Sequence, residues 1–339
     1  MKPTDFSYYL TGFLTKYLPN ECGASPHTIA SYRDTFVLLL RFLNENLNIS
    51  ANKLKLSQLN HTIIEKYLTW IESDRGCKVS TRNVRLTAIH SFFLYLHYEY
   101  PDFLEQWQKI LLIPMKKAEN GDMNYMKSDG IELLLRQPDQ KTRTGRRDLA
   151  LLSLMYDTAA RVQEIVDLRP IDISLSEPFT VKLTGKGKKV RFVPMMKKQM
   201  DILKLYMEEN KFTEPYASQY SLFRNKQGNK LTRAGVGYIL DKYINMARLE
   251  NPSIVPEKFT CHCLRHSKAM AMLMADVHLV YIRDFLGHVS IQTTERYARV
   301  DSSRKREAIE NAYQDLTPNS EAVWEGNSDL MDWLRNFDK

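Results

Sequence analysis

Apolar side chains in the first hundred residues recur at intervals of three and four, the pattern of amphipathic helices with one buried face. The first set follows Ser25 and Pro26, which suit a helix cap and a first helical turn. A second set follows Asn60 and a third follows Ser80. The periodic positions are Ile29, Tyr32, Phe36, Leu39, Leu43, Ile64, Leu68, Ile71, Leu86, Ile89, Phe93 and Leu96. We therefore predict an N-terminal region built of helices.

This periodicity is interrupted at residues 113–122, which contain proline, glycine and charges of both signs. Such a segment is typical of an exposed linker. The chain has 339 residues, and single cores seldom keep growing beyond roughly 250 to 300 residues. We predict an N-terminal domain at residues 1–115, a linker at 116–127, a second domain at 128–317 and a C-terminal tail at 318–339.

Beyond the linker, we predict a helix from about Ser128 and then a strongly apolar, buried helix. The buried helix contains Leu149, Leu152 and Tyr156. The hydrophobic period changes to two in residues 171–194, which indicates strands joined by turns. The alternating positions are Ile171, Ile173, Leu175, Val181, Leu183, Val190 and Phe192. The spacing of apolar residues typical of helices resumes from about Lys197. The predicted fold class is therefore mainly α with a small antiparallel β-sheet.

The composition is that of a soluble globular protein. Hydrophobic residues make up 43% of the chain, and no stretch approaches the roughly 20 apolar residues of a membrane-spanning helix. Residues 1–5 lack the apolar run of a secretion signal, so we expect a cytoplasmic protein. The four cysteines, Cys22, Cys77, Cys261 and Cys263, do not form a disulfide framework for a chain of this size and are expected to be reduced.

The formal net charge of +8 favours a polyanionic partner, because clustered cations release the counterions held around DNA. Charge alone is a weak indicator, since many basic proteins bind no nucleic acid. On the third predicted helix, Arg82 and Arg85 fall outside the apolar stripe. Spacing alone favours a solvated face for them over a DNA contact.

Two positions in the second domain place a cation where it can approach an anion. Arg161 follows the buried helix, and Glu164, three residues later, is suited to orient it. In isolation, a surface arginine at a helix end explains this pattern better. Lys186 lies between Gly185 and Gly187 in a predicted hairpin turn. A phosphate-binding P-loop is excluded, because the spacing of the glycines and the following residues do not fit that motif.

The segment from His262 to His266 raises the question of a zinc site, since its two histidines are four residues apart. We reject zinc because the glutamate of a zinc hydrolase is missing, Arg265 would repel a dication, and the cysteines are too tightly spaced. On a helix, His262 and Arg265 share one face. We interpret them as an anion clamp beside a proton-transfer group.

Two further features complete the candidate chemistry. Gly287 is suited to end a helix, so that His288 projects inward. Tyr297 lies near the start of a polar helix, where a lone tyrosine usually serves packing or a hydrogen bond. Each of these signals is weak by itself.

Taken in order, the pattern Arg, Lys, His-x-x-Arg, Gly-His and Tyr resembles the tyrosine recombinases, also called phage-type integrases, and in particular Xer-like site-specific recombinases. The resemblance extends over roughly residues 10–315 and includes residues 222–232 and the predicted helix starts at 25–28 and 80–83. One departure is Ala159, where the family commonly has glycine; this change removes no functional group.

The resemblance implies a catalytic set that cleaves DNA without metal, cofactor or ATP. Arg161 and Arg265 would hold the phosphate, and Tyr297 would attack it to form a 3′-phosphotyrosine. His262 would accept the phenol proton, and His288 would hydrogen-bond the phosphate. Lys186 would protonate the leaving 5′-oxygen.

The resemblance also implies partners and a domain plan. Residues 1–115 would form a helical core-binding, SAM-like domain, and residues 128–317 a catalytic domain of the DNA breaking-rejoining type. The two would clamp duplex DNA as a homo-tetramer on synapsed sites, with exchange of a helix at Ser303–Leu316. Accessory DNA-bending proteins are a further possibility. The expected DNA contacts are Arg82, Arg85, Lys116, Lys117, Lys188 and Lys189.

The tail at 318–339 is acidic yet contains two tryptophans and several apolar residues. Either it docks on protein and restrains cleavage, or it is a packed terminal helix. For the whole chain, we predict integration or excision of a mobile element. The alternatives are chromosome dimer resolution, DNA relaxation by a type IB topoisomerase, and a DNA-binding protein without catalysis.

Overall fold

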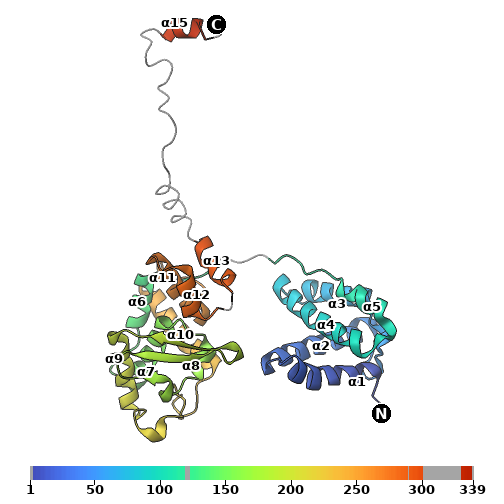
Figure 1. The fold of residues 1–339 in the computed structure, drawn as a ribbon, viewed down its shortest axis with the longest axis horizontal. Coiled ribbons are helices and arrows are strands. Elements are labelled where there is room, and N and C mark those ends of the chain that lie inside the picture. The colour runs from blue at the N-terminus through green and yellow to red at the C-terminus, as the bar shows by residue number, and fades with distance from the viewer. Residues whose placement is uncertain (1–2, 119–122, 289, 301–329, 338–339) are drawn as a thin grey trace. The chain divides into compact units, whose positions relative to one another are not determined.

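The computed structural model describes residues 3–118, 123–288, 290–300 and 330–337. The chain separates into two compact units, Met1–Gly121 and Asp122–Lys339, which are considered separately below (Figure 1). Helices predominate in both units, and the only sheet among the described residues has three antiparallel strands. The predicted fold class, mainly α with a small antiparallel sheet, is therefore confirmed.

The N-terminal unit consists of helices and short helical turns. They are α1 (Asp5–Gly12), the π-helix η1 (Phe13–Glu21), α2 (Pro26–Leu47), η2 (Ala51–Lys53), η3 (Leu56–Gln58), α3 (His61–Ser73), α4 (Val79–Glu99), η4 (Pro101–Phe103) and α5 (Leu104–Leu111). Helices α3 and α5 both pack against α4, and η1 packs against α2 and α4. The prediction of a helical N-terminal region is confirmed.

Local capping chemistry explains where two of these helices begin. The Ser25 side chain accepts a hydrogen bond from the backbone N–H of Thr28, and Pro26 opens α2. The Asn60 side chain caps α3 in the same way through Ile63. Ser80 was the wrong choice for the third helix, because α4 already begins at Val79 without a side-chain cap.

Aromatic rings fill much of the core of the N-terminal unit. Phe13 of η1 lies 6.2 Å from Phe36 of α2 and 5.3 Å from Phe92 of α4, measured between ring centroids. All three side chains are buried. Aromatic side chains bury large apolar areas, and edge-on pairs add stabilisation beyond that area. The segment before Ser25, for which no helix was predicted, is therefore an integral part of this core.

The C-terminal unit surrounds its sheet with helices. The elements are α6 (Ser128–Arg136), α7 (Arg143–Asp157), α8 (Val162–Val166), η5 (Pro170–Asp172), β1 (Ile173–Ser174), β2 (Thr180–Thr184), η6 (Lys186–Lys188), β3 (Val190–Pro194), α9 (Lys197–Glu209), η7 (Pro215–Ala217), α10 (Arg233–Glu250), α11 (Cys261–Met274), α12 (Leu279–Leu286), α13 (Gln292–Val300) and α15 (Leu330–Arg335). The strand order is β1-β2-β3. Helix α7 packs against α9 and α11, and nearly all of its apolar side chains are buried, as predicted.

The strand pairing gives an antiparallel sheet in the predicted region, but several of the alternating positions do not face the core. Val190 and Phe192 of β3 are 48% and 67% exposed, and Leu175 follows β1, which ends at Ser174. Val181 and Leu183 of β2 point into the core and pair with Val193 and Arg191 of β3. Ile171 was predicted to belong to the alternating set, but it lies in η5 and is 57% exposed. The prediction of a strand at Ile171 was wrong because Pro170 starts a 3-10 turn there.

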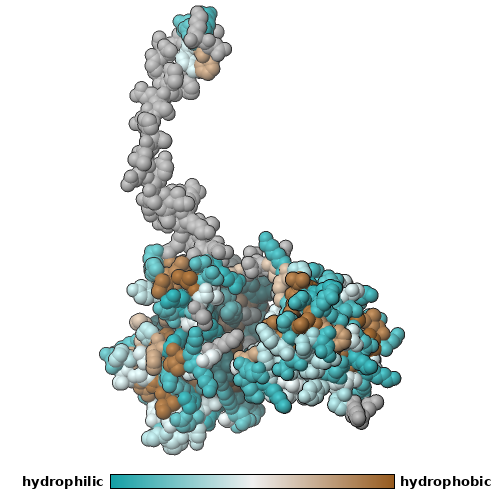
Figure 2. Space-filling view, turned by 45° about the vertical axis from the view of Figure 1, so that its right-hand side comes forward, coloured by the Kyte–Doolittle hydropathy of each residue, from teal (hydrophilic) through white to brown (hydrophobic). Residues whose placement is uncertain are grey.

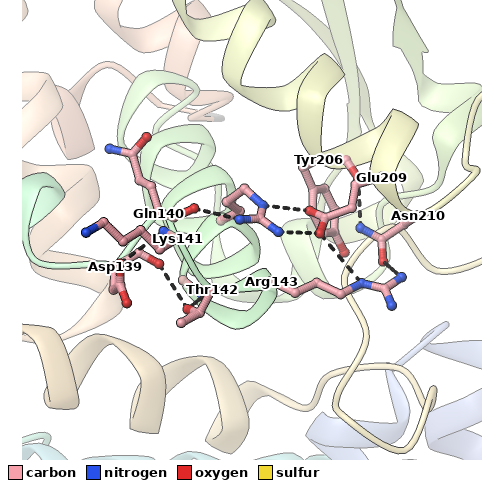
Figure 3. A network of polar contacts seen from close by, with 10 residues as sticks. Asp139, Gln140, Lys141, Thr142, Arg143, Tyr206, Glu209 and Asn210 are labelled. Atoms are coloured by element: carbon pink, nitrogen blue, oxygen red, sulfur yellow. Dashed lines mark hydrogen bonds and ion pairs between the residues drawn. The ribbon is translucent and has the colours of Figure 1, made fainter.

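Polar contacts join the start of α7 to the end of α9. Arg146 donates two hydrogen bonds to the Glu209 carboxylate, at 3.0 and 2.6 Å, and a third to the carbonyl of Gln140. Figure 3 shows this network, in which Arg143 also reaches Asn210. A two-pronged guanidinium–carboxylate pair fixes geometry better than a single contact. These contacts lock two helices that support the sheet.

The face of the molecule seen in Figure 2 is largely hydrophilic. On this face, hydrophobic residues gather only in small separate patches. Within the described parts of the chain, no helix is both long and apolar enough to span a membrane. The helix predicted at 303–316 lies outside the described residues, as does most of the tail, of which residues 330–337 are described and contain α15.

Candidate active site

The residues of the predicted catalytic set come from separate parts of the C-terminal unit. They are Arg161 at the start of α8, Lys186 in the turn between β2 and β3, His262 and Arg265 on α11, His288 just after α12, and Tyr297 on α13. Helices α11, α12 and α13 pack against one another, and α11 also packs on α7, which leads into α8. This packing brings distant parts of the sequence to one place.

Arg265 is the buried cation at the centre of this site, with 1% of its surface exposed. Its Nη1 donates to the carbonyl of Ala159 at 2.6 Å, and its Nη2 donates to the carbonyl of Leu286 at 2.5 Å. Burial, together with the nearby charges of Arg161 and Arg191, lowers the pKa of Arg265 to about 9. The guanidinium therefore stays charged at neutral pH and links α7, α11 and the end of α12.

Ala159 adopts an unusual backbone conformation, with φ of +46°. Left-handed backbone is disfavoured for residues that carry a Cβ atom. The conformation persists because Ala159 is fully buried and its carbonyl accepts the hydrogen bond from Arg265. Although the family commonly has glycine at this position, the carbonyl of Ala159 thus still contacts Arg265.

Glu164 holds two arginines at once. Its carboxylate accepts hydrogen bonds from the backbone N–H of Arg161 at 2.8 Å and from Nη1 of Arg161 at 3.0 Å. It also accepts two from Arg191, at 2.9 and 2.7 Å. Burial favours the protonated acid, but the bonds from Arg191 and Arg161 outweigh it and keep the pKa of Glu164 below its ordinary value. Glu164 is therefore an ionised orienting group, as its spacing from Arg161 suggested.

Gly287 ends α12 in the left-handed conformation, with φ of +64°, which confirms the predicted helix end. The site also needs glycine here for space. A Cβ atom at this position would lie 3.2 Å from Cδ and 3.3 Å from Nη1 of Arg191. Arg191 therefore passes directly beside the turn that leads into His288.

His288 is half-buried and is oriented from the helix that carries the tyrosine. Its Nδ1 lies 3.0 Å from Oγ1 of Thr294, a fully buried residue of α13. Burial, followed by the charges of Arg265 and Arg161, lowers the pKa of His288 to about 4. A neutral imidazole whose Nδ1 contacts Thr294 can make one further hydrogen bond through its other ring nitrogen.

Tyr297 is almost completely buried, with 2% of its surface exposed. Its hydroxyl oxygen lies 3.0 Å from Nδ1 of His266. The ring of His266 in turn contacts that of His262 at 4.2 Å between centroids, in an edge-on arrangement. Burial raises the pKa of Tyr297, and the charges of Arg265, Arg296 and Arg161 offset only part of that effect. The phenol is therefore protonated at neutral pH and borders a chain of two imidazoles.

The site is strongly electropositive. Burial is the main cause that lowers the pKa of His262, and the neighbouring arginines Arg265, Arg161 and Arg296 lower it further. The same field and burial bring the pKa of His266 to about 4. Fixed positive charges surround imidazoles that are neutral. This arrangement is expected of a site that binds an anion.

Lys186 occupies the turn η6 between β2 and β3, and its side chain is not among those described. The hairpin itself is well defined, since Gly187 takes a left-handed φ of +73° and the N–H of Gly185 bonds the carbonyl of Lys189. Gly185 also lies beside the Glu164 carboxylate, where a Cβ atom would come within 2.9 Å of Oε1. The base of this hairpin thus borders the arginine cluster.

The structure brings Arg161, His262, Arg265, His288 and Tyr297 together. Sequence reasoning missed three members of the same cluster: Arg191, His266 and Thr294. His266 had been considered only as a zinc ligand, and Arg191 lies 27 residues from its partner Glu164. Thr294 lies three residues before Tyr297, but nothing in its spacing pointed to His288.

The predicted DNA contacts of the N-terminal unit require one correction. Arg82 does not lie on a free surface, because it is 5% exposed and its Nη1 donates to the carbonyl of Pro114 at 2.9 Å. Its neighbour Asn83 exchanges two hydrogen bonds with the backbone of Lys116. The placement of Arg82 outside the buried stripe was wrong, since its side chain fixes the segment at Pro114 to α4.

The other residues predicted to contact DNA differ in their exposure and in the partners they already have. Arg85 is half-buried and donates to the carbonyl of Ser31 and to Thr35. Lys116 pairs with Glu72 at 2.6 Å, although its own side chain is 54% exposed. Lys117, Lys188 and Lys189 are exposed. A role in DNA contact stays a prediction for these residues.

No cluster of three or more metal-ligating side chains occurs within the ranges that the structure describes. His262 and His266 do share a face of α11, but their other neighbours are arginines and a tyrosine. Cationic neighbours disfavour a bound dication, so the donor set does not suit a metal.

Comparison with known proteins gives matches over most of the chain. Residues 124–304 match the phage integrase family, and residues 11–99 match the phage integrase N-terminal SAM-like domain. An integrase/recombinase of Sinorhizobium fredii is 35% identical over 300 residues, covering 88% of this chain and 89% of that protein. Tyrosine recombinase XerC of Pelotomaculum thermopropionicum is 28% identical over 310 residues, covering 90% and 97% of the two chains.

Solved structures with the same fold include complexes with DNA. The site-specific recombinase XerH bound to its difH substrate before cleavage matches with a TM-score of 0.66 and 23% identity, covering 88% of this chain and 84% of that one. The Tn1549 transposon integrase with a circular intermediate DNA matches with a TM-score of 0.68 and 14% identity, covering 91% and 100%. At these identities the likeness shows the fold.

Proposed function

The chain belongs to the phage integrase family and is a tyrosine recombinase, an enzyme of site-specific DNA recombination, and we propose that it works through a 3′-phosphotyrosine intermediate on Tyr297. The observation that carries this proposal is the placement of the Tyr297 hydroxyl in a buried site that also contains Arg161, Arg265 and neutral histidines. Cleavage and rejoining would need neither a metal nor ATP.

The two arginines would neutralise the scissile phosphate. A phosphodiester anion repels nucleophiles, and a guanidinium offers two parallel donors to its non-bridging oxygens. Arg161 is suited to this role because Glu164 fixes its direction while 37% of its side chain remains exposed. Arg265 is fixed by two carbonyls, that of Ala159 between α7 and α8 and that of Leu286 at the end of α12. Preorganised donors of this kind typically contribute about 100-fold to 1000-fold in rate each.

The proton transfers would accompany phosphoryl transfer. The phenol oxygen of Tyr297 forms a bond to phosphorus while the bond from phosphorus to the 5′-oxygen breaks. The phenol proton passes to an imidazole of α11, for which the family resemblance names His262, and Lys186 would protonate the leaving 5′-oxygen. His288, oriented by Thr294, would donate to a phosphate oxygen. The phosphodiester energy is kept in the tyrosine link, so a 5′-hydroxyl from a partner strand reverses the step.

The proposed substrate is duplex DNA that carries recombination sites. Structural relatives were solved with such DNA, namely XerH with difH and the Tn1549 integrase with a circular intermediate. We assign core binding to residues 1–115, the linker to 116–127, catalysis to 128–317 and an accessory role to the tail at 318–339. A homo-tetramer on two synapsed sites, linked through the segment 303–316, would perform strand exchange.

The proposed biological role is integration or excision of a mobile element. The 35% identical integrase/recombinase of Sinorhizobium fredii supports this choice, whereas the XerC relatives keep chromosome dimer resolution as the second candidate. Sequencing the DNA on either side of the gene separates the two. Terminal repeats that bind the protein would support the mobile element, and binding only to a chromosomal site near the replication terminus would contradict it.

A nicked suicide substrate tests the chemical proposal, because loss of the short cleaved strand traps the covalent complex. The wild-type protein should form a covalent protein–DNA adduct, and Tyr297→Phe should bind the same DNA without forming one. Exchange between two labelled sites separates recombination from simple relaxation of supercoils. Specific binding without an adduct would instead support a DNA-binding protein without catalysis.

A further inference from the structure

His266 is a half-buried titratable group that the mechanism above leaves unused. It follows Arg265 directly on α11, and its Nδ1 lies 3.0 Å from the Tyr297 hydroxyl oxygen. The two rings are 5.6 Å apart between centroids and meet edge-on at 62°. Both distance and orientation suit a hydrogen bond between a phenol and an imidazole.

Among the described residues, His266 is the hydrogen-bond partner of this hydroxyl. His262, to which the family resemblance gives the phenol proton, packs its ring against that of His266. The charge of Arg161 acts on His262 in addition to those of Arg265 and Arg296. Of the two histidines, His266 is the one whose ring nitrogen contacts the Tyr297 hydroxyl.

The direction of the hydrogen bond follows from the chemistry of the two groups. His266 is neutral at neutral pH, because burial, and then the positive fields of His262, Arg296 and Arg265, bring its pKa to about 4. A phenol is a better donor than a neutral imidazole N–H, and an imidazole nitrogen is a better acceptor than a phenol oxygen. The Nδ1 lone pair of His266 therefore accepts the Tyr297 hydroxyl, with the imidazole proton on Nε2.

We propose that His266 is a catalytic residue that accepts the Tyr297 proton as the phenol attacks phosphorus, while His262 contacts the phosphate. This inference rests on the proposed function, in which Tyr297 is the nucleophile. In the forward step the O–P bond to Tyr297 forms, the P–O5′ bond breaks, and the phenol proton moves to Nδ1. In the rejoining step His266 returns that proton to the tyrosine oxygen.

Bound DNA would make this transfer easier than in the free protein. Burial is the largest cause of the low pKa of His266, and the charges of His262, Arg296 and Arg265 lower it further. A phosphate anion in the site neutralises that field and so raises the basicity of the imidazole.

Two substitutions separate proton acceptance from packing. His266→Phe keeps a ring but removes the acceptor, and His266→Asn puts an amide oxygen near the position of Nδ1 without a basic nitrogen. Both are compared with wild type for DNA binding and for the single-turnover rate of adduct formation. One substrate has the natural 5′-oxygen, and the other has a 5′-bridging sulfur, which leaves without protonation.

If His266 accepts the proton, both variants should form the adduct about 100-fold or more slowly on both substrates, because general bases contribute about 100-fold to 10000-fold. Lys186→Ala should be slow only on the oxygen substrate. The rate of His266→Asn should rise with pH as phenolate forms, while that of His262→Phe should keep the wild-type pH profile.

The proposal fails if His266→Asn binds DNA and forms the adduct at the wild-type rate, or if its pH profile matches that of wild type. Should His266→Phe fold poorly, His266→Asn decides the question alone. Absence of any adduct with the wild-type protein would overturn the proposed function itself, which is a different outcome. A third outcome would overturn only the role of His266. In it, the wild-type protein forms the adduct, Tyr297→Phe does not, and His266→Asn forms it at the wild-type rate.

Discussion

Arg191 donates two hydrogen bonds to Glu164, the carboxylate that also fixes Arg161. The distances are 2.9 Å from Nη1 to Oε1 and 2.7 Å from Nη2 to Oε2. Arg191 belongs to β3 and Glu164 to α8, so this pair ties the hairpin that contains Lys186 to one of the two arginines of the site. The pair is well shielded from water, with 11% and 2% of the two side chains exposed.

Glu164→Gln should weaken both the fold and the reaction. The amide keeps the shape of the side chain but removes the negative charge between two guanidinium groups. Removing one partner of a buried ion pair typically costs about 3 kcal/mol or more. We expect a loss of this size in the free energy of unfolding measured with urea. Adduct formation should also be at least about 10-fold slower, because Arg161 loses its orientation. Glu132→Gln, at an exposed pair with Arg136, is the control and should change neither.

The same residue should give the protein a specific acid sensitivity. The pKa of Glu164 is lower in the folded protein than its ordinary value of 4.5. Its contribution to stability is therefore fully present above about pH 4.5 and is lost as pH falls through the lowered value. Urea unfolding at several pH values should show a decline in the wild type below about pH 4.5 and a flatter curve for Glu164→Gln. Parallel curves would contradict the account.

The backbone of Ala159 offers a test of how Arg265 is held. Ala159→Val places a β-branched residue in left-handed backbone at a fully buried position, so it should cost about 2 kcal/mol or more of stability. The distorted carbonyl should also slow adduct formation. Ala159→Gly is the matched control and should retain cleavage, since glycine adopts this conformation freely. A Val variant with wild-type melting and cleavage would count against this role for the Ala159 carbonyl.

Thr294→Val tests the orientation of His288. The substitution keeps the shape of the buried side chain but removes the hydroxyl that lies 3.0 Å from His288 Nδ1. We expect adduct formation to slow by about 10-fold, at the lower end of what loss of an orienting partner costs. Thr294→Ser restores the hydroxyl and should restore most of the rate. Equal rates in the Val and Ser variants would show that the contact does not matter.

The salt dependence of DNA binding should separate exposed from structural cations. Lys189→Ala should reduce the slope of log affinity against log salt by about 1, as expected for the loss of one phosphate contact. Arg82→Ala should instead lower the melting temperature and leave the slope unchanged, because Arg82 is buried against Pro114. Fluorescence anisotropy with labelled DNA measures the slope. The reverse pattern would restore Arg82 as a DNA contact.

Local signals in the sequence were enough for the features that depend on neighbours along the chain. Ser25 and Asn60 cap helices because a cap involves only residues within one turn. Gly287 ends α12 because a left-handed residue at a helix end favours glycine. The small sheet follows from a period of two with a glycine-rich turn at Gly187. These elements are decided by short-range geometry.

Features that depend on contacts between distant segments could not be read in this way. Arg82 resembles a surface residue by spacing, yet the chain near Pro114 returns to cover it. Arg191 alternates with the predicted apolar positions Val190 and Phe192, yet the fold pairs it with the buried Leu183, where it meets Glu164. His266 lay in a recognised motif, but its partner Tyr297 is 31 residues away. Sequence order predicted which residues form the site without showing which of them touch.

The most direct test of the central claim is to identify the atom that links protein to DNA. The adduct from a suicide substrate is digested with protease, and the peptide that stays attached to DNA is analysed by mass spectrometry, together with the ends of the cleaved strand. The predicted result is Tyr297 joined to a 3′-phosphate, with a free 5′-hydroxyl on the released strand. Attachment through another residue, or through a 5′-phosphate, would contradict the account.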